Sequence, residues 1–154
     1  PTTSLCVDLM EEKIKVGETV LDVGTGSGIL MIVGEQLGAR FVCGVDIDEL
    51  AVEVAHENLE LNAVPKEKYK VLHGNLIEKI ETKSYDVVVA NILADILLLL
   101  LKDISSVVKT GGKIIFSGII EEKVNEVIAA VEGAGMKVEK VLAKGEWRAL
   151  AIRA

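Results

Sequence analysis

The residues best suited to chemistry form a glycine-rich turn, Asp22-Val23-Gly24-Thr25-Gly26-Ser27-Gly28, directly after a short apolar run. Glycine has no side chain, so the backbone can turn tightly there and approach a ligand closely. The spacing is G-x-G-x-G, whereas dinucleotide sites typically use G-x-G-x-x-G, and Ile29 stands where their third glycine would be. We expect Asp22, at the end of a strand, to orient this turn. The predicted cofactor-binding residues of the turn are Asp22, Gly24, Gly26 and Gly28.

Two further polar residues follow the next two predicted strands. Asp46 ends the second strand, 22 residues after Gly24, and open α/β sheets bind ligands beyond such strand ends. A carboxylate there can accept hydrogen bonds from both ribose hydroxyls of a nucleoside. Asn75 follows the third strand, and its amide can hydrogen-bond the edge of an adenine base. We therefore predict that both residues bind the cofactor, and Asp46 alone is compatible with NAD or with S-adenosylmethionine.

The fourth predicted strand ends at Asn91, at the mouth of the sheet, where a transferred group should meet its acceptor. The Asn91 amide can accept a hydrogen bond from a substrate amine without adding charge, which predicts a catalytic role. An asparagine at this place also suits the cap of the following helix. No residue in the sequence stands out as a general base.

Alternating strands and helices must position these residues. We predict parallel strands over 19–23, 41–46, 69–73, 85–91 and 113–117, each followed by a helix, and a closing antiparallel hairpin of 138–143 and 147–153. Right-handed crossovers would then give a doubly wound, Rossmann-like α/β sheet of seven mostly parallel strands. The C-terminal antiparallel hairpin distinguishes this arrangement from the usual dinucleotide-binding fold.

Helical periodicity predicts helices over 4–13, 28–37, 49–62, 94–108 and 121–132. Thr3 is placed to cap the first of these helices, and Asp48 to cap the third. In the third helix we expect Leu50, Val54 and Leu61 to face the core. In the last helix the expected buried face consists of Val124, Val127, Ile128 and Val131.

Composition narrows the class of protein. A chain of 154 residues fits one domain, and half of its residues are hydrophobic, with only 3% aromatic. The net charge of −7 disfavours non-specific binding to nucleic acid and favours a basic protein partner. The longest apolar run, 96–101, is far shorter than the ~20 residues of a membrane span. Cys6 and Cys43 lack metal-site spacing, so we expect no metal and two reduced, packed thiols in a cytoplasmic protein.

Several segments together resemble the ribosomal protein L11 methyltransferase family, and the likeness spans nearly the whole chain. These segments are residues 1–6, the loop 22–30, Gly44-Val45-Asp46-Ile47-Asp48, Ala90-Asn91-Ile92-Leu93-Ala94, Ser117-Gly118-Ile119 and Glu146-Trp147. The corner at Asn91 is informative, because many amide and base-amine methyltransferases have two prolines where Ile92 and Leu93 stand here.

The resemblance implies a class I, S-adenosylmethionine-dependent enzyme that methylates lysine side chains and the N-terminal amine of ribosomal protein L11. It also implies contacts to the methyl donor from Thr3, Gly24, Asp46 and Asn91. Residues 1–154 would be the catalytic domain. The family's N-terminal substrate-recognition domain, and the lead-in that precedes Pro1 in the family, do not occur in this sequence.

Other functions remain open. The chain could be another class I methyltransferase that acts on a small molecule or a different protein, or a donor-binding domain without catalysis. A nicotinamide-dependent oxidoreductase is disfavoured by the G-x-G-x-G spacing and by the closing hairpin.

Overall fold

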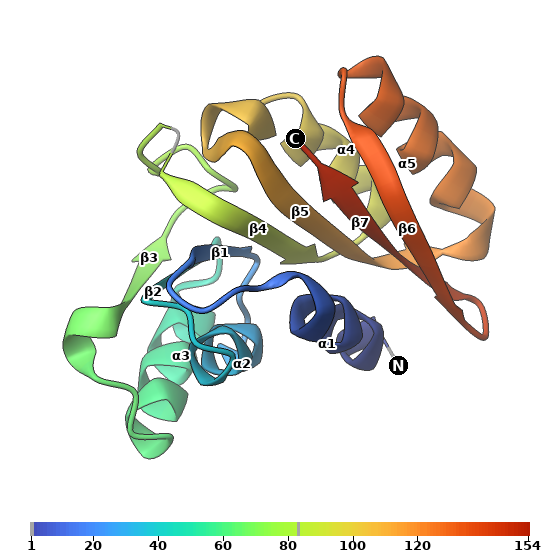
Figure 1. Ribbon diagram of the computed structural model, residues 1–154. Helices are drawn as coiled ribbons and strands as arrows, with labels where there is room; N and C mark the ends of the chain where they lie inside the picture. The colour runs from blue at the N-terminus through green and yellow to red at the C-terminus, as the bar shows by residue number, and fades with distance from the viewer. Residues whose placement is uncertain (1, 83) are drawn as a thin grey trace.

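The computed structural model describes residues 2–82 and 84–154, so Pro1, part of one quoted segment, lies outside the described residues. Figure 1 shows a twisted sheet of seven strands in the order β3-β2-β1-β4-β5-β7-β6. The first five strands are parallel, and β7 runs antiparallel to both β5 and β6. The predicted fold class is confirmed. The strands are β1 (Thr19–Val23), β2 (Phe41–Asp46), β3 (Tyr69–His73), β4 (Tyr85–Asn91), β5 (Val108–Ile120), β6 (Lys137–Lys144) and β7 (Trp147–Arg153).

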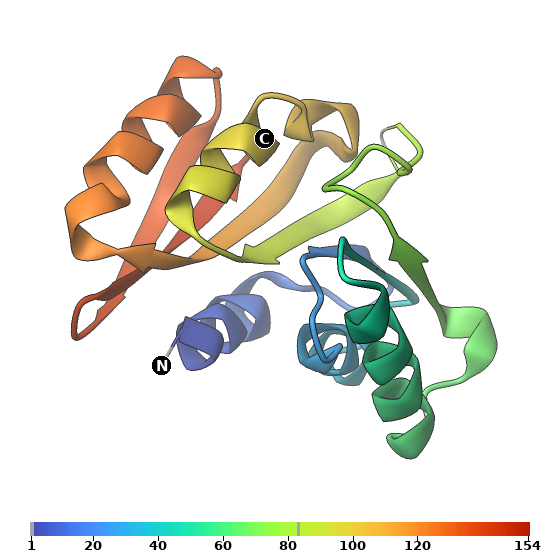
Figure 2. The same cartoon turned by 180° about the vertical axis from the view of Figure 1, so that it is seen from behind.

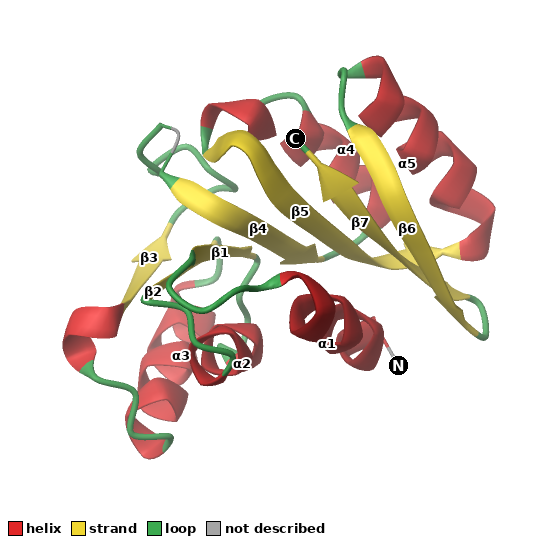
Figure 3. Cartoon of the chain, viewed as in Figure 1, coloured by secondary structure: helices red, strands yellow, loops and turns green. Residues whose placement is uncertain are grey.

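Helices cover both faces of the sheet, as the colouring by secondary structure makes clear (Figure 3). Three helices lie on one face and two on the other, and the two are seen from their own side in Figure 2. The first group is α1 (Thr2–Lys13), α2 (Ile29–Gln36) and α3 (Glu49–Leu61), and the second is α4 (Ala94–Leu101) and α5 (Glu121–Gly133). Two short 3-10 helices occur at Lys66–Lys68 and Ile104–Ser106.

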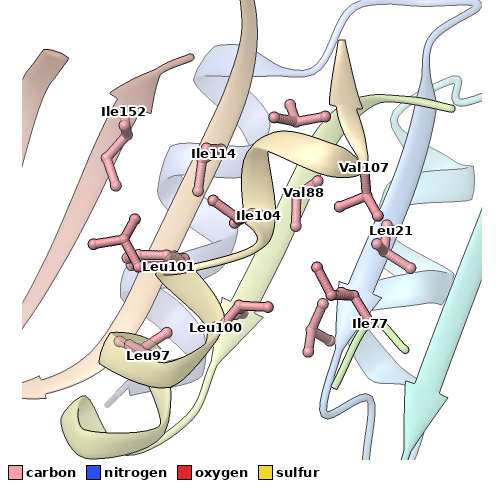
Figure 4. Packing of buried hydrophobic residues seen from close by; sticks show 14 of the residues in the cluster. Leu21, Ile77, Val88, Leu97, Leu100, Leu101, Ile104, Val107, Ile114 and Ile152 are labelled. Carbon is pink, nitrogen blue, oxygen red and sulfur yellow. The ribbon is translucent and has the colours of Figure 1, made fainter. Parts of the chain in front are cut away.

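Each face of the sheet has its own apolar core, built almost entirely from aliphatic side chains. Figure 4 shows the core on the α4 side, where Leu97, Leu100 and Ile104 pack against Val88 and Ile114 of the sheet. Side chains buried on both faces explain the unbroken apolar runs of the central strands. Cys6 and Cys43 are free thiols, one in the core of each face, as predicted.

Helix α3 buries a different face from the one we expected. Leu50, Val54 and Leu61 are 65%, 36% and 81% exposed, whereas Ala55 and Leu59 are fully buried. The small side chain of Ala55 lets α3 approach the start of α2 closely, since a β-carbon added to Gly28 would lie 3.1 Å from Ala55 Cβ. Close packing therefore outweighs the larger apolar side chains in orienting this helix. The expected face of α5 is confirmed, with Val127 and Val131 buried and Val124 and Ile128 packed against the core.

The boundary between α4 and β5 differs from the prediction of a helix over 94–108 and a strand over 113–117. Helix α4 ends at Leu101 and β5 begins at Val108, because the backbone there pairs with Tyr85 of β4. Tyr85 N donates to Val107 O at 3.1 Å. Gly111 and Gly112 lie inside β5, at a register irregularity, rather than before the strand. The described residues between β3 and β4 form no α-helix, so the prediction of a helix after every parallel strand is wrong at β3.

In the described part of the chain, the helices are too short or too polar to cross a membrane.

Candidate functional site

The glycine-rich turn joins β1 to α2 at the carboxyl edge of the sheet. The backbone N–H groups of Gly24 and Thr25 donate to Val45 O at 2.8 and 3.0 Å, which fastens the turn to the end of β2. Gly24, Gly26 and Gly28 all have positive φ, at 76°, 55° and 84°, a region that side chains disfavour. The backbone conformation therefore favours glycine at all three positions of the turn.

Asp22 lies beneath this turn and is only 1% exposed. Its Oδ2 accepts a hydrogen bond from Thr25 Oγ1 at 2.8 Å, while its Oδ1 has no hydrogen-bond partner among the described residues. Burial raises the pKa of the Asp22 carboxyl to about 7; the hydrogen bond from Thr25 opposes this shift, and the negative charge of Asp46 adds to it. The contact with Thr25 fits the expectation that Asp22 orients the turn.

Asp46 stands at the end of β2 with both carboxylate oxygens held by backbone donors. Gly26 N donates to Oδ2 at 2.8 Å and Asp48 N donates to Oδ1 at 2.9 Å. A carboxylate offers about four acceptor positions, so capacity for two further hydroxyl donors remains. Asp48 caps α3 as predicted, because its side chain accepts from Leu50 N at 3.0 Å.

A cavity of about 430 Å³ opens beside these residues, between the ends of β1 to β4 and the start of α4. Three of the predicted cofactor contacts line it: Gly24, Asp46 and Asn75. The rest of its wall is mostly apolar. These lining residues are Val23, Val45, Ile47, Gly74, Leu76, Ile92, Leu93 and Ile96.

The apolar residues of this wall were not among the site residues predicted from the sequence, which were polar residues and glycines. The sequence does contain one indication of it, because the apolar Ile47 directly follows Asp46, the last residue of β2. Ile47 is 67% exposed and lines the cavity. Leu93 is likewise 71% exposed. Leu76 adopts a φ of 52°, which costs a leucine roughly 1–2 kcal/mol. Exposed and strained apolar groups at a cavity are typical of a ligand site.

Gly28 lies against Ala55 of α3, so packing between helices already accounts for a glycine there. Gly24 instead lies against the Asn91 corner, where a β-carbon would come within 2.7 Å of Ile92 Cγ2. The turn and the corner are therefore built to touch. This close contact depends on the absence of a side chain at Gly24 and on the backbone conformation that brings Ile92 to the turn.

The corner itself joins three elements. Asn91 Nδ2 points to Thr3 Oγ1 at 3.5 Å, and Ser117 Oγ donates to Thr2 O at 2.9 Å. Helix α1 already begins at Thr2, so Thr3 lies in its first turn and the prediction of Thr3 as the cap is wrong. Its hydroxyl faces Asn91 instead. Asn91 does not cap α4 either, since the residue before that helix is Leu93 and no side chain supplies a cap bond.

Gly118 also lies in this corner. Its φ is 81°, and a β-carbon there would lie 2.9 Å from Ile92 O and 3.1 Å from Asn91 Oδ1. Glycine at this position leaves room beside the Asn91 amide oxygen. The site thus consists of a nucleoside-sized apolar cavity with a fixed carboxylate, adjoining a neutral corner of Thr3, Asn91 and Gly118. The cavity volume and its few converging polar groups fit an adenosine-containing cofactor.

Comparisons with known proteins agree on one family. The family model described as "Ribosomal protein L11 methyltransferase (PrmA)" matches residues 1–154. The chain is 54% identical over 150 residues to the ribosomal protein L11 methyltransferase of Fusobacterium nucleatum, and 49% identical to that of Lactococcus lactis. Each match covers 97% of this chain but only 48% and 47% of the relative, so the chain spans about half the length of these relatives.

Solved structures show the same likeness. A ribosomal protein L11 methylase from Lactobacillus delbrueckii superposes with a TM-score of 0.93 at 34% identity, covering 98% of this chain and 77% of that one. A SAM-dependent methyltransferase from Aquifex aeolicus superposes with a TM-score of 0.81 at 22% identity, covering 95% and 87% of the two chains, which shows the shared fold.

Proposed function

The chain belongs to the ribosomal protein L11 methyltransferase family, and we propose that it binds S-adenosylmethionine and transfers the donor's methyl group to an amine of a protein. The observation that supports this proposal is that two parts of the site lie next to each other. One is the cavity whose Asp46 carboxylate is fixed by Gly26 and Asp48, and the other is the corner where Asn91 meets Thr3.

The residues divide between binding and orientation. Asp46 is placed to accept hydrogen bonds from the ribose hydroxyls, and Asn75 to bond the edge of the base. Ile47, Leu76 and Ile96 supply apolar walls for the flat face of the base. Gly24 and Gly26 let the backbone approach the donor, with Asp22 and Thr25 holding the turn from below. Gly28 acts through the packing of α2 on α3.

When bound, the donor supplies an electrophilic methyl group on sulfonium sulfur. The acceptor amine must be neutral to attack, although a lysine amine has a reference pKa of about 10.4. Desolvation at the apolar rim lowers the pKa of such an amine, since burial disfavours its charged form. The Asn91 carbonyl oxygen can accept one N–H of the neutral amine and so direct its lone pair. The contribution of these residues is positioning rather than proton abstraction.

Ribosomal protein L11 is the proposed protein substrate, and its lysine side chains and N-terminal amine are the proposed acceptors. The relatives' name supports the protein, and the net charge of −7 supports a basic partner. We also propose that residues 1–154 form the methyltransferase domain. In this proposal the substrate-recognition domain corresponds to the half of the relatives that the chain does not match.

Two measurements test the proposal. Donor at ~100 times its Kd adds about 2.7 kcal/mol of stability, and each kcal/mol raises the Tm of a domain this size by roughly 2–4 °C. We therefore expect S-adenosylmethionine to raise the Tm by about 5–10 °C and NAD to leave it unchanged. No shift with millimolar donor, or a larger shift with NAD, contradicts donor binding.

The second measurement is the intact mass of ribosomal protein L11 after incubation with the chain and the donor, beside a parallel reaction with a full-length relative. We expect mass increments of one methyl group, at a lower kcat/KM than the full-length enzyme. Donor binding without any methylated product, while the relative is active, would make this chain a donor-binding domain only.

A further inference from the structure

Asp22 combines deep burial with incomplete hydrogen bonding. Its Oδ2 accepts from Thr25 Oγ1 at 2.8 Å, and its Oδ1 has no partner within the described part of the chain. Neighbouring strands place Gly44 and Val89 at its register position, so neither supplies a donor side chain there. A buried carboxylate oxygen without a donor is costly, and a proton on the carboxyl group lowers that cost by removing the buried charge.

Of the titratable groups that face Asp22, the Asp46 carboxylate opposes its ionisation, and Cys6 and Cys43 are neutral thiols because burial raises the pKa of each. Helix α1 presents Cys6, and β2 presents Cys43 and Asp46. Among the described residues, the only hydrogen-bond donor at the carboxyl group is the neutral Thr25 hydroxyl. These surroundings agree with the raised pKa of about 7, caused mainly by burial. Asp22 is therefore divided between its neutral and ionised forms near neutral pH.

Thr25 belongs to the turn that we propose contacts the donor, so its hydrogen bond connects Asp22 to the proposed donor site. S-adenosylmethionine carries a positive sulfonium, and S-adenosylhomocysteine, the product, does not. A nearby positive charge favours an ionised carboxylate, most strongly where water is excluded. The inference from here on rests on the proposed function.

We propose that Asp22 is a positioning residue that exchanges a proton with solvent during the reaction cycle: its protonated form is more populated when the cavity is empty or holds the product, and its ionised form is favoured when the cavity holds the donor. The proton leaves the Asp22 carboxyl group for solvent as the cationic donor binds. After methyl transfer the sulfur is an uncharged thioether, and Asp22 regains a proton from solvent. Asp22 thereby helps the site to prefer the charged donor over the neutral product.

The sign of the pH effect follows from this exchange. Donor binding favours the ionised form, so the donor's Kd should fall as pH rises toward about 7, by up to about tenfold per pH unit, and level off above it. Product binding should lack most of this slope. Since the raised pKa leaves Asp22 partly protonated near neutral pH, donor binding at pH 7 should release a fraction of one proton.

Isothermal titration calorimetry at pH 7 in phosphate and in Tris counts the released protons, because the two buffers differ in ionisation enthalpy. The donor and the product are each titrated into the wild-type chain, Asp22→Asn and Asp48→Asn. Asp48 is an exposed acid at the same edge and serves as the matched control. We expect proton release with the donor in wild type and in Asp48→Asn, little with the product, and loss of the difference in Asp22→Asn. The donor's own amine titrates equally in all three chains and cancels.

A direct measurement covers the case in which Asp22→Asn does not fold. The carboxyl ¹³C shift of Asp22 in the wild-type chain, followed by NMR from pH 5 to 8, reports its proton with and without ligand. A titration midpoint near 7 that moves down with the donor and stays with the product supports the proposal. The same midpoint in all three states, or equal proton release for donor and product, overturns it. Absence of binding by either ligand would instead contradict the proposed function.

Discussion

Gly24 and Ile92 approach one another so closely that a β-carbon on Gly24 would lie 2.7 Å from Ile92 Cγ2. The two residues are 68 positions apart in the sequence. Their contact joins the turn that should carry the donor to the corner where the acceptor should arrive. In the proposed function, the alignment of donor and acceptor depends on this close contact, and alignment is the main contribution of such a site to the rate.

We expect Gly24→Ala to weaken donor binding by at least about tenfold, because the new methyl group must displace Ile92 or the turn. The φ of 76° adds strain of roughly 1–2 kcal/mol. Gly17→Ala is the matched control, since Gly17 has a φ of 89° and open space around it. It should lower the Tm while donor affinity stays as in wild type. Calorimetric titration and thermal unfolding separate the effects.

Ile92→Ala in the Gly24→Ala background should restore part of the donor affinity, because it removes the colliding methyl group. An equal loss of affinity in the single and double variants would show that the collision is not the cause.

Asp46→Ala should weaken donor binding by about 10- to 150-fold, the equivalent of one charge-assisted hydrogen bond of about 1.5–3 kcal/mol. Asn91→Ala should change donor affinity less and lower kcat instead. Asp48→Ala is the control for lost structure: it removes the cap of α3, at about 1 kcal/mol of stability, and should leave donor affinity unchanged. Equal donor Kd values for Asp46→Ala and Asn91→Ala would refute the division of roles.

Lys113→Met should destabilise the fold by about 2–4 kcal/mol, as measured by urea unfolding. The Lys113 ammonium bonds Glu18 Oε1 at 2.8 Å and the carbonyl of Lys13 at the end of α1. Its loss removes the donor to the Lys13 carbonyl and leaves the Glu18 carboxylate with only the Lys15 N–H as a donor among the described residues. Lys113→Met with Glu18→Gln should regain part of the loss. The exposed pair of Lys140 and Glu12 provides a comparison, and Lys140→Met should cost far less. Similar costs for both lysines would contradict a structural role for Lys113.

The stability of the ligand-free chain should carry a signature of Asp22. Its folded-state pKa of about 7 lies above the ordinary value of 3.8, so the folded state holds the proton more tightly than the unfolded state does. The stabilisation from this proton is complete below about pH 4 and is lost as pH rises to about 7. Urea unfolding of wild type and Asp22→Asn at pH 5 and pH 8 tests this. The free energy of unfolding of wild type, relative to that of Asp22→Asn, should be lower at pH 8 than at pH 5. If the difference between the two chains is the same at both pH values, the pKa of Asp22 is not raised.

Local sequence patterns were sufficient to predict those features that depend only on residues close together in the chain. The limits of β1, β2, β3 and β4 were predicted from short apolar runs that end in glycine or a polar residue. The Asp48 cap was predicted in the same way, because it satisfies a donor only two residues away. The glycine turn and Asp46 could be located since strand ends meet at one edge of any parallel sheet.

Only the tertiary structure decided which surfaces meet. Helix α3 turns Ala55 rather than Leu50 inward, since the closeness of α2 matters more than the size of the apolar group. Val108, predicted to end a helix, begins β5 instead, because it pairs with Tyr85 of β4, which lies 23 residues earlier in the sequence. The approach of Gly24 to Ile92 and the meeting of Thr3 with Asn91 join distant segments. The Asp22 oxygen that has no partner among the described residues depends on burial. Such contacts arise from packing in three dimensions, and no local pattern of residues encodes them.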